Sequence, residues 1–221
     1  MAGSNKALGN VARQANKKLR RERILGIAKK LIATNGLEAF TLSQLAEEAG
    51  VTSPTIHNLF GKKSDIVEEL VAEMIQTVKA VIAQTAPSDL IENCYFVADR
   101  AFEQFGENEN FWRAAFQAAA YLDLFNPQKP DGLYSRAWQL AKPRPEWHED
   151  GHLLGNVAFQ LIWKKVHDAQ RLARLDWVAG HIDLKQYRRQ VVQDLLLTYA
   201  ADASPELHVR LSKALSELDD E

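Results

Sequence analysis

The sequence contains a single cysteine, Cys94, so the chain cannot form a disulfide within itself. One free thiol suits a reducing compartment, and a cytoplasmic protein is expected. The chain also lacks an apolar run of roughly 18 residues, which is the length that a membrane-spanning helix needs. Residues 1–14 lack the apolar core of a signal peptide. We therefore expect a protein with no membrane partner.

Several signatures of catalysis are missing as well. There is no Gly-rich phosphate loop, no Gly-x-Ser-x-Gly and no Cys-x-x-Cys. The alternation of apolar and polar residues that is typical of strands is absent, and so is any internal repeat. The sequence therefore predicts an all-α fold, without a cofactor and without enzymatic activity.

The one segment that suggests a metal site is 146–152. His148 and His152 are four residues apart with three acidic residues nearby, a set of donors that suits a divalent ion. Two prolines and Gly151 indicate a loop, however, so helical spacing does not bring the two imidazoles together. We interpret the segment as a solvated acidic loop and expect no bound metal.

Acidic residues are absent from residues 1–21, which contain six lysines and arginines. Residues 1–65 carry a net charge of +6, and because the whole chain carries −2, the remainder carries −8. A basic N-terminal part joined to an acidic body points to a polyanionic partner at one end only.

Residues 41–63 contain two short helical patterns separated by a turn. Thr41 and Gln44 have the spacing of a capping box, and Gly50 stands where the first helix would end in a left-handed conformation. Thr52 is then placed to cap a second helix that has Pro54 in its first turn. Two capped helices about a short turn are the plan of a helix-turn-helix, whose second helix enters the major groove of DNA.

The flanking residues add further features. An arginine-led helical pattern precedes the stretch, which contains Asn-Gly-x-x-x-Phe-Thr, Leu-Ala-x-x-Ala-Gly-Val-Thr, Thr-Ile-x-x-x-Phe-Gly and a lysine before a fourth helix. Residues 21–71 thereby closely resemble the DNA-binding domain of the TetR family of transcriptional regulators. The resemblance implies an N-terminal three-helix helix-turn-helix domain and a C-terminal helical bundle that dimerises. It also implies double-stranded DNA, a small-molecule effector and a second copy of the chain as partners.

We divide the chain on this basis into a basic, flexible arm (1–18), a helix-turn-helix domain (19–63) and a ligand-binding and dimerisation domain (64–221). The arm either reaches along the duplex or continues the first helix from about residue 10, and both remain open. Gly36 is expected to end the first helix. Later helices are expected at 64–84, 87–105, 109–125, 131–142, 152–178, 183–201 and 205–218, with a loop at 142–151.

The residues expected to face DNA lie at the starts of the two helix-turn-helix helices, on the exposed side of the second, and before the fourth helix. They are Thr41, Gln44, Thr52, Ser53, Thr55, His57, Asn58, Lys62 and Lys63. Hydroxyls and N-terminal amides suit phosphates, while Thr55 and Asn58 suit base edges, asparagine preferring adenine. Lys63 corresponds to the family's phosphate-binding lysine. Lys62 departs from the small capping residue usual in the family, leaving only Asp65 of that capping box.

The family resemblance also implies a cavity for a hydrophobic effector among the later helices. The residues expected there are Phe102, Trp112, Phe116, Gln117, Phe159, Trp163 and His167. The last two helices are expected to pair with those of a second subunit. Their expected contact residues are Val191, Leu195, Tyr199, Leu207 and Leu211.

The function expected from these features is a ligand-responsive repressor that binds a palindromic operator as a dimer. The main alternative is a carrier of lipids or hydrophobic ligands on the same fold, with vestigial DNA binding. Such a carrier would show an eroded recognition helix and loss of its positive charge, and the sequence has neither.

Overall fold

The computed structural model describes residues 2–126, 128–129, 132–133, 136 and 143–219, without the side chains of 2–13, 159, 163 and 219. The helix expected at 131–142 falls mostly outside this part of the chain. The described elements are α1 (Ala2–Ala39), α2 (Leu42–Glu48), α3 (Ser53–Phe60), α4 (Lys63–Thr85), α5 (Leu90–Glu107), α6 (Glu109–Tyr121), α8 (Pro145–Glu149), α9 (Phe159–Ala179), α10 (Leu184–Ala200) and α11 (Pro205–Asp219). Because all of these are helices, the predicted all-α class is confirmed.

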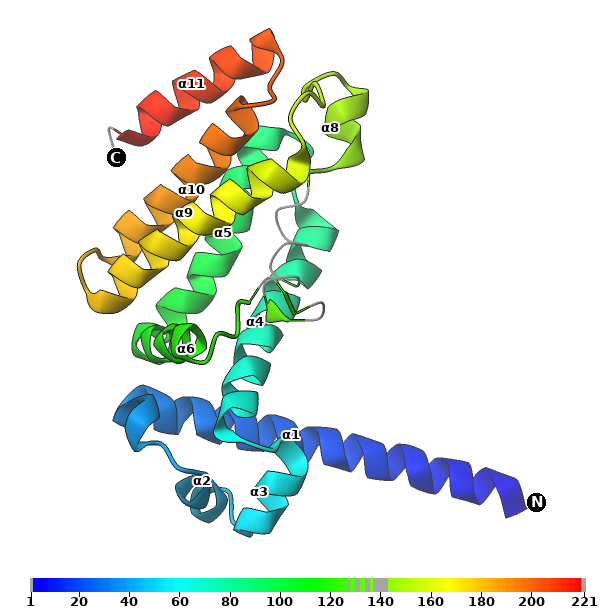
Figure 1. Cartoon of the computed structure of the whole chain (residues 1–221). Helices are drawn as coiled ribbons and strands as arrows, with labels where there is room; N and C mark the ends of the chain where they lie inside the picture. Colours follow the sequence, from blue (N-terminus) through cyan, green and yellow to red (C-terminus); the bar gives the residue numbers. More distant parts are fainter. Residues whose placement is uncertain (1, 127, 130–131, 134–135, 137–142, 220–221) are drawn as a thin grey trace. The chain divides into compact units, whose positions relative to one another are not determined.

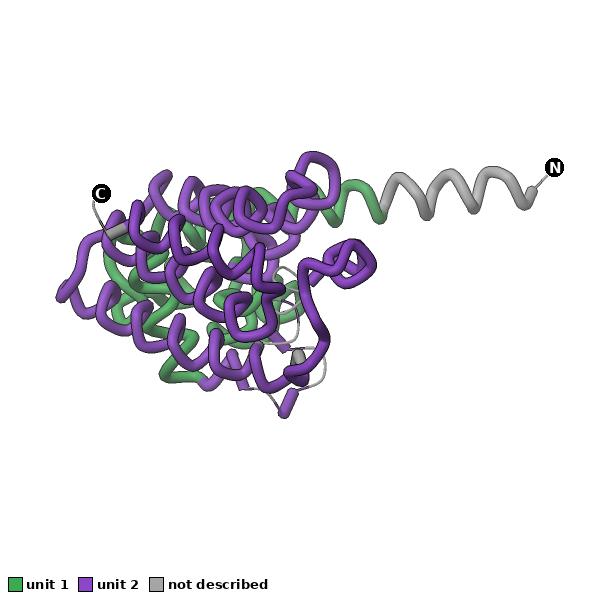
Figure 2. Tube along the Cα trace, turned by 90° about the horizontal axis from the view of Figure 1, so that it is seen from above, with its two compact units in different colours: residues 1–70, 110–122 green, residues 71–109, 123–221 purple. Residues whose placement is uncertain are grey.

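The chain divides into two compact units (Figure 2). Unit 1 comprises residues 1–70 and 110–122, and unit 2 comprises residues 71–109 and 123–221. The chain therefore passes between the units three times, after residues 70, 109 and 122. The domain boundary predicted after residue 63 remains a prediction.

Unit 1 contains the helix-turn-helix. Its α2 and α3 pack against one another beneath α1 (Figure 1). The helical path of α1 is interrupted at Gly36, which has φ 73°, so the predicted end of the first helix is confirmed. The core residues of these three helices recur at helical spacing and are fully or nearly fully buried: Ile24, Leu25, Ala28, Ile32, Phe40, Leu45, Ala46, Ala49, Ile56 and Phe60.

The helix α6 belongs to unit 1 although it is distant from α1 in sequence. Phe111 and Trp112 of α6 are buried, and the Lys29 ammonium of α1 lies 5.4 Å from the centroid of each ring. A cation over an aromatic face is an attractive contact. The nearly all-round apolar character of α6 is explained by this burial against the helix-turn-helix unit.

Unit 2 is a bundle in which α10 contacts α5, α9 and α11 (Figure 1). Stacked rings join α5, α9 and α10 at its centre: Trp177 lies 5.8 Å from Phe105 and 5.3 Å from Tyr187 between ring centroids. The indole nitrogen of Trp177, which is fully buried, donates to Glu109 Oε1 at 3.1 Å. Burial of these large rings supplies much of the apolar contact in the bundle.

Three predicted boundaries in unit 2 are wrong. The helix expected from Pro87 begins at Leu90, because the side chain of Asp89 caps the amides of Ile91 and Glu92 at 3.0 and 3.1 Å. The loop expected at 142–151 contains the short helix α8. The helix expected at 152–178 begins only at Phe159.

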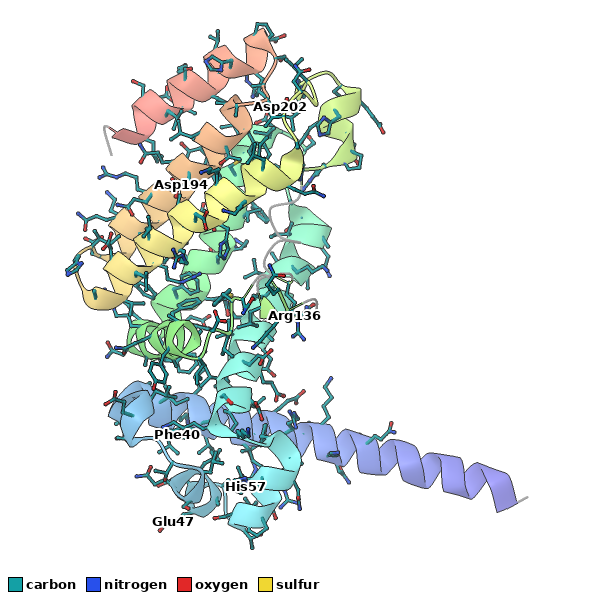
Figure 3. The ribbon with its side chains drawn as sticks, in the orientation of Figure 1. Phe40, Glu47, His57, Arg136, Asp194 and Asp202 are labelled. Carbon is teal, nitrogen blue, oxygen red and sulfur yellow. The ribbon has the colours of Figure 1, made fainter. Side chains whose placement is uncertain are left out.

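The late start of α9 has a specific cause. The carboxylate of Asp202, beyond the end of α10 (Figure 3), accepts hydrogen bonds from the amides of Gly155, Asn156 and Val157 at 2.8, 2.8 and 3.1 Å. An isolated antiparallel bridge pairs Leu153 with Ala203 beside it. These contacts hold the segment 153–157 outside the helix.

Candidate nucleic-acid interface

The start of α2 is fixed by a reciprocal cap. The amide of Gln44 donates to Thr41 Oγ1 at 3.2 Å, and the amide of Thr41 donates to Gln44 Oε1 at 3.0 Å. The predicted capping box is therefore confirmed. Both side chains are exposed, so they hold the helix end at the surface, where its amides are available to a phosphate.

The turn between α2 and α3 depends on Gly50. This residue has φ 61°, a left-handed conformation that other residues adopt at a cost. The amide of Val51 then donates to the Ala46 carbonyl at 2.9 Å, which closes the turn. Arg23 of α1 donates to the carbonyl of Ala49 at 2.9 Å and thereby ties α1 to the end of α2.

The start of α3 differs from the prediction in one detail. Thr52 occupies the capping position with extended backbone, but its side chain makes no hydrogen bond to the helix amides. Its hydroxyl lies instead 2.9 Å from the hydroxyl of Thr55. Pro54 has no amide hydrogen, and the amide of Thr55 donates to the carbonyl of Thr52 at 2.9 Å, so the backbone donor left to an anion in this first turn is the amide of Ser53.

The two faces of α3 are clearly different. Ile56 and Phe60 are buried, whereas His57 and Asn58 are exposed, and Thr55 is half-buried. Figure 3 labels His57 on this helix. Its Nδ1 lies 3.1 Å from the carbonyl oxygen of Gly61, which orients the ring along the end of α3. The outward face therefore offers one threonine, one histidine and one asparagine to a partner.

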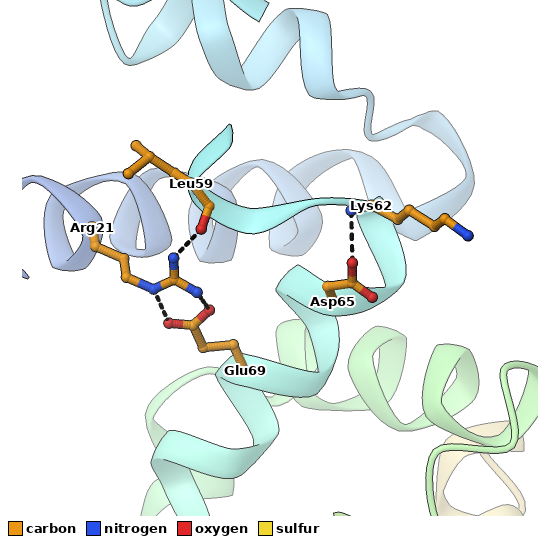
Figure 4. Close-up of polar contacts among 5 residues, drawn as sticks. All are labelled: Arg21, Leu59, Lys62, Asp65 and Glu69. Atoms are coloured by element: carbon orange, nitrogen blue, oxygen red, sulfur yellow. Dashed lines mark hydrogen bonds and ion pairs between the residues drawn. The ribbon is translucent and has the colours of Figure 1, made fainter. Parts of the chain in front are cut away.

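The junction from α3 to α4 requires a glycine. Gly61 has φ 86°, and a Cβ added there would lie 2.5 Å from Asp65 Oδ2. That oxygen accepts a hydrogen bond from the amide of Lys62 at 2.8 Å (Figure 4). Half of a capping box is thus formed at the start of α4 despite the lysine at position 62. Lys62 is exposed, whereas the half-buried Lys63 has its ammonium 3.4 Å from the Glu38 carbonyl oxygen.

One contact that stabilises this arrangement was not anticipated from the sequence. Arg21 of α1 donates to both carboxylate oxygens of Glu69 in α4 and to the carbonyl of Leu59 in α3 (Figure 4). The guanidinium also lies 4.4 Å from the centroid of the Phe60 ring. A bidentate arginine–carboxylate pair combines strength with fixed geometry. Arg21 therefore positions α3 rather than adding free positive charge to the basic N-terminal part.

Other cations of α1 remain at the surface. Lys17, Lys18 and Arg20 are exposed, and among the described side chains Lys18 alone of the three has an ion pair, with Glu22 at 3.8 Å. Because α1 begins at Ala2, these residues lie on a continuous helix. Unit 1 therefore combines the exposed face of α3 with basic residues on α1 and before α4.

Comparison with known proteins agrees with this geometry. The family model of bacterial regulatory proteins of the tetR family matches residues 24–70. The HTH-type transcriptional regulator YvkB of Bacillus subtilis (strain 168) is 26% identical over 106 residues, which are 48% of this chain and 56% of that protein. The match thus spans just over half the length of the curated relative.

Solved structures agree on the fold. The transcriptional repressor QsdR of R. erythropolis matches with a TM-score of 0.55 and 16% identity, over 85% of this chain and 97% of that chain. The fatty acid degradation regulator FadR from Bacillus halodurans matches with a TM-score of 0.52 and 18% identity, over 80% and 94%. Residues 24–70 belong to the tetR family of bacterial regulatory proteins. Proteins of this family are transcription regulators and are not enzymes.

The effector residues predicted for this TetR-family chain are divided between the units. Trp112, Phe116 and Gln117 lie on α6 in unit 1, where both rings are buried and the glutamine is exposed. Phe102 and His167 lie in unit 2, and the side chains of Phe159 and Trp163 are outside the described ones. The effector site expected from the family therefore stays a prediction.

The two described effector candidates of unit 2 differ in their surroundings. Phe102 lines a groove of about 410 Å³ whose other residues are mostly charged and of both signs: Asp99, Arg100, Glu103, Lys185 and Arg188. His167 is half-buried, and desolvation lowers the pKa of its imidazole to about 4. The ring is therefore neutral at pH 7, which suits an apolar neighbour better than a charged one.

The residues predicted for the TetR-family dimer interface are buried within a single chain. The exposed fractions of Val191, Leu195, Tyr199, Leu207 and Leu211 are between 0 and 9%. These side chains face inward because α10 packs simultaneously against α5, α9 and α11. The dimer interface predicted at these residues stays a prediction.

The segment once considered for a metal also has a structural explanation. His148 lies exposed on α8, and His152 follows it beside the bridge from Leu153. Within the described part of the chain, no group of three or more His, Cys, Asp or Glu side chains is arranged to hold a metal ion. No helix in that part is long and apolar enough to cross a bilayer.

Proposed function

We propose that this TetR-family protein binds operator DNA as a dimer and represses transcription until a small hydrophobic effector releases it. The observation that carries the DNA-binding part is the exposed face of α3, with Thr55, His57 and Asn58 facing outward from a buried Ile56–Phe60 side. A helix with one buried apolar side and polar residues on the outward side suits readout of the major groove.

Positive charge near this face supports the same proposal. Lys62 precedes α4 and Lys63 begins it, and Lys17, Lys18 and Arg20 are exposed on α1. Each lysine or arginine that neutralises a phosphate releases a counterion, so affinity for DNA falls steeply with salt. Binding of duplex DNA is therefore expected to weaken as the salt concentration rises.

The function is tested by selecting DNA fragments from the source genome on the immobilised protein and sequencing them. We expect the selected fragments to share an inverted repeat whose half-sites are about 34 Å apart, one turn of B-DNA, or a multiple of it. Selection of fragments without a common motif, or selection that survives high salt unchanged, would contradict the proposal.

The dimer surface that we propose lies on the outer side of α9 and α10. Leu161, Leu172 and Leu175 lie on one face of α9 and are 40–59% exposed, and Leu197 of α10 is 52% exposed. Leu161 and Leu197 line a groove of about 400 Å³ between the two helices. An exposed apolar strip of this kind is characteristic of an interaction surface.

The charge in that groove is small. Lys165 and Asp194 are its ionisable residues, and burial raises the pKa of the Asp194 carboxyl to about 6. This carboxyl is therefore charged at pH 7 and increasingly neutral below pH 6. A second copy that covers the groove meets one acid and one base rather than a patch of a single sign.

The double substitution Leu161→Glu and Leu197→Glu is expected to weaken dimerisation at least about 100-fold, because two charges would be buried without partners. Sedimentation velocity across a range of concentrations measures the effect. The matched control is Val209→Glu on α11, where Val209 is 69% exposed. If Val209→Glu produces monomers and the double variant does not, the pairing lies on α10 and α11, as the sequence predicted, and the α9–α10 surface is wrong.

The route by which an effector would act follows from the chain path. Helix α4 contains the boundary between the units after residue 70, and α6 enters unit 1 from unit 2 at both of its ends. An effector that prefers one arrangement of unit 2 can thus change unit 1 through three covalent connections. It shifts the DNA-binding equilibrium only by its difference in affinity for the two arrangements.

A further inference from the structure

Unit 1 contains a groove that shares Lys62 and Lys63 with the residues expected to contact DNA. Its volume is about 560 Å³, within the range of small-molecule sites, roughly 300–1,000 Å³. Three segments supply its walls: the end of α1, the start of α4 and one face of α6. The lining residues are Leu37, Glu38, Lys62, Lys63, Ser64, Ala114, Gln117, Ala118, Tyr121 and Leu122.

The α6 wall is apolar except at its edges. Ala114, Ala118 and Tyr121 follow at helical spacing, and Leu37 and Leu122 are both half-buried. The side chain of Tyr121 is 90% exposed, which is unusual for a large aromatic residue. An exposed ring beside an apolar groove gains free energy when a ligand covers it.

The opposite end of the groove is cationic. Two ammonium groups, those of Lys62 and Lys63, face one carboxylate, that of Glu38, among the lining residues. The Lys62 ammonium has no ion-pair partner among the described residues, while that of Lys63 contacts only a backbone carbonyl and the Phe40 ring. The start of the 23-residue helix α4 already carries the Asp65 carboxylate, which accepts a hydrogen bond from the Lys62 amide, so the two ammonium groups supply the attraction for an anion.

We propose that this groove binds an amphipathic carboxylate, with its apolar chain or ring against Tyr121 and Leu122 and its carboxylate between Lys62 and Lys63. The side-chain amide of Gln117 and the hydroxyl of Tyr121 can donate hydrogen bonds to the same ligand or accept hydrogen bonds from it. The site is built entirely from unit 1 and is therefore separate from any effector site in unit 2.

Occupancy of the groove is expected to affect DNA binding, and this part of the proposal rests on the proposed function. Lys62 and Lys63 are the lysines expected to contact DNA phosphates, and one ammonium cannot neutralise a ligand carboxylate and a phosphate equally well at the same time. The ligand therefore competes with DNA at the lysines themselves, without a rearrangement of unit 2.

Binding is tested by calorimetric titration of the full chain with decanoate, using the uncharged decanol as the matched probe. We expect saturable binding of decanoate that weakens about tenfold in Tyr121→Ala and in Lys62→Gln, and weaker binding of decanol. Lys30→Gln, an exposed lysine of α1 that does not line the groove, should bind decanoate normally. Because Tyr121, Lys62 and Lys30 are all exposed, thermal melting of the three variants should match that of the parent chain.

Three outcomes of the binding experiment would overturn the proposal. They are no binding of decanoate, equal affinity for decanoate and decanol, and undiminished binding of decanoate by the double variant Tyr121→Ala, Lys62→Gln. The last outcome would place the ligand in unit 2.

Competition is tested separately, by fluorescence anisotropy with a labelled duplex. Decanoate should raise the apparent Kd for DNA in the parent chain and leave it unchanged in Tyr121→Ala, which keeps both lysines. Decanoate sensitivity equal in the two proteins would overturn the competition. A chain that binds no duplex at all would contradict the proposed function, while the calorimetry would still decide whether the groove is a site.

Discussion

Replacing Thr55 and Asn58 together by alanine is expected to lower affinity for the operator about 100-fold, with little change in affinity for unrelated duplex. These side chains lie on the outward face of α3, away from Ile56 and Phe60, so their loss removes base-edge contacts without disturbing the core. A good base contact contributes about 1–3 kcal/mol of discrimination. Fluorescence anisotropy with the selected operator and with a scrambled duplex measures both affinities.

Lys63→Ala should behave differently, since a lysine on a phosphate carries no sequence information. It is expected to weaken binding to both duplexes by a similar factor and to reduce the slope of log Kd against log salt by about one. The matched control for the double variant of Thr55 and Asn58 is the double variant Thr34→Ala and Asn35→Ala. These are the same residue types, exposed near the end of α1 in the same unit. Unaltered operator binding by the triple variant of Thr55, Asn58 and Lys63 would show that α3 is not the recognition helix.

The second large effect is expected at Asp202. Substitution by alanine should lower the free energy of unfolding of unit 2 by about 3–5 kcal/mol, because three amides lose a charged acceptor in a site where Asp202 is only 5% exposed. The released segment 153–157 leads directly into α9. Urea denaturation followed by tryptophan fluorescence measures the loss.

Asp202→Asn separates hydrogen bonding from burial. Its remaining carbonyl can still accept from Asn156 and Val157, but its amide group would face the amide of Gly155, donor against donor. We expect a loss between those of the parent chain and the alanine variant. Asp150→Ala, an exposed acid near the same segment, should leave stability within about 0.5 kcal/mol. Equal stability of Asp202→Ala and the parent chain would show that the three hydrogen bonds contribute nothing net.

The helix-turn-helix was predictable because its determinants are local. Thr41 and Gln44 are three residues apart, and Gly50 needs only its own backbone freedom to close the turn. The prediction of Thr52 was only partly right for the same reason. A sequence pattern identifies the capping position, but the Thr52 hydroxyl lies against the hydroxyl of Thr55 and not against the helix amides. Local hydrogen bonds of a threonine side chain compete at similar energies, so the pattern does not decide between them.

The wrong start of α5 comes from a local cap by Asp89, whereas the wrong start of α9 comes from contacts between residues far apart in sequence. Periodicity around residue 152 suggested a helix, yet the amides at 155–157 bond to a carboxylate more than 40 residues later. Apolar residues of α10 were predicted to form a dimer interface; neighbouring helices bury them within one chain, and their part in a dimer stays a prediction. Periodicity identifies an apolar face but does not say which surface covers it.

The amino-acid sequence by itself determined the all-α class, the capped helix-turn-helix of residues 41–60 and the choice of an outward polar face on α3. These depend on interactions within a few residues, whose energies are the same wherever the segment lies. Only the tertiary structure decided that Arg21 is neutralised by Glu69, that α6 joins unit 1, and that Tyr121 lies with Lys62 and Lys63 around one groove. Such pairings depend on which surfaces, distant in sequence, are brought together. The hydrophobic effect is non-directional, so a pattern of apolar residues does not identify the surface that will cover it.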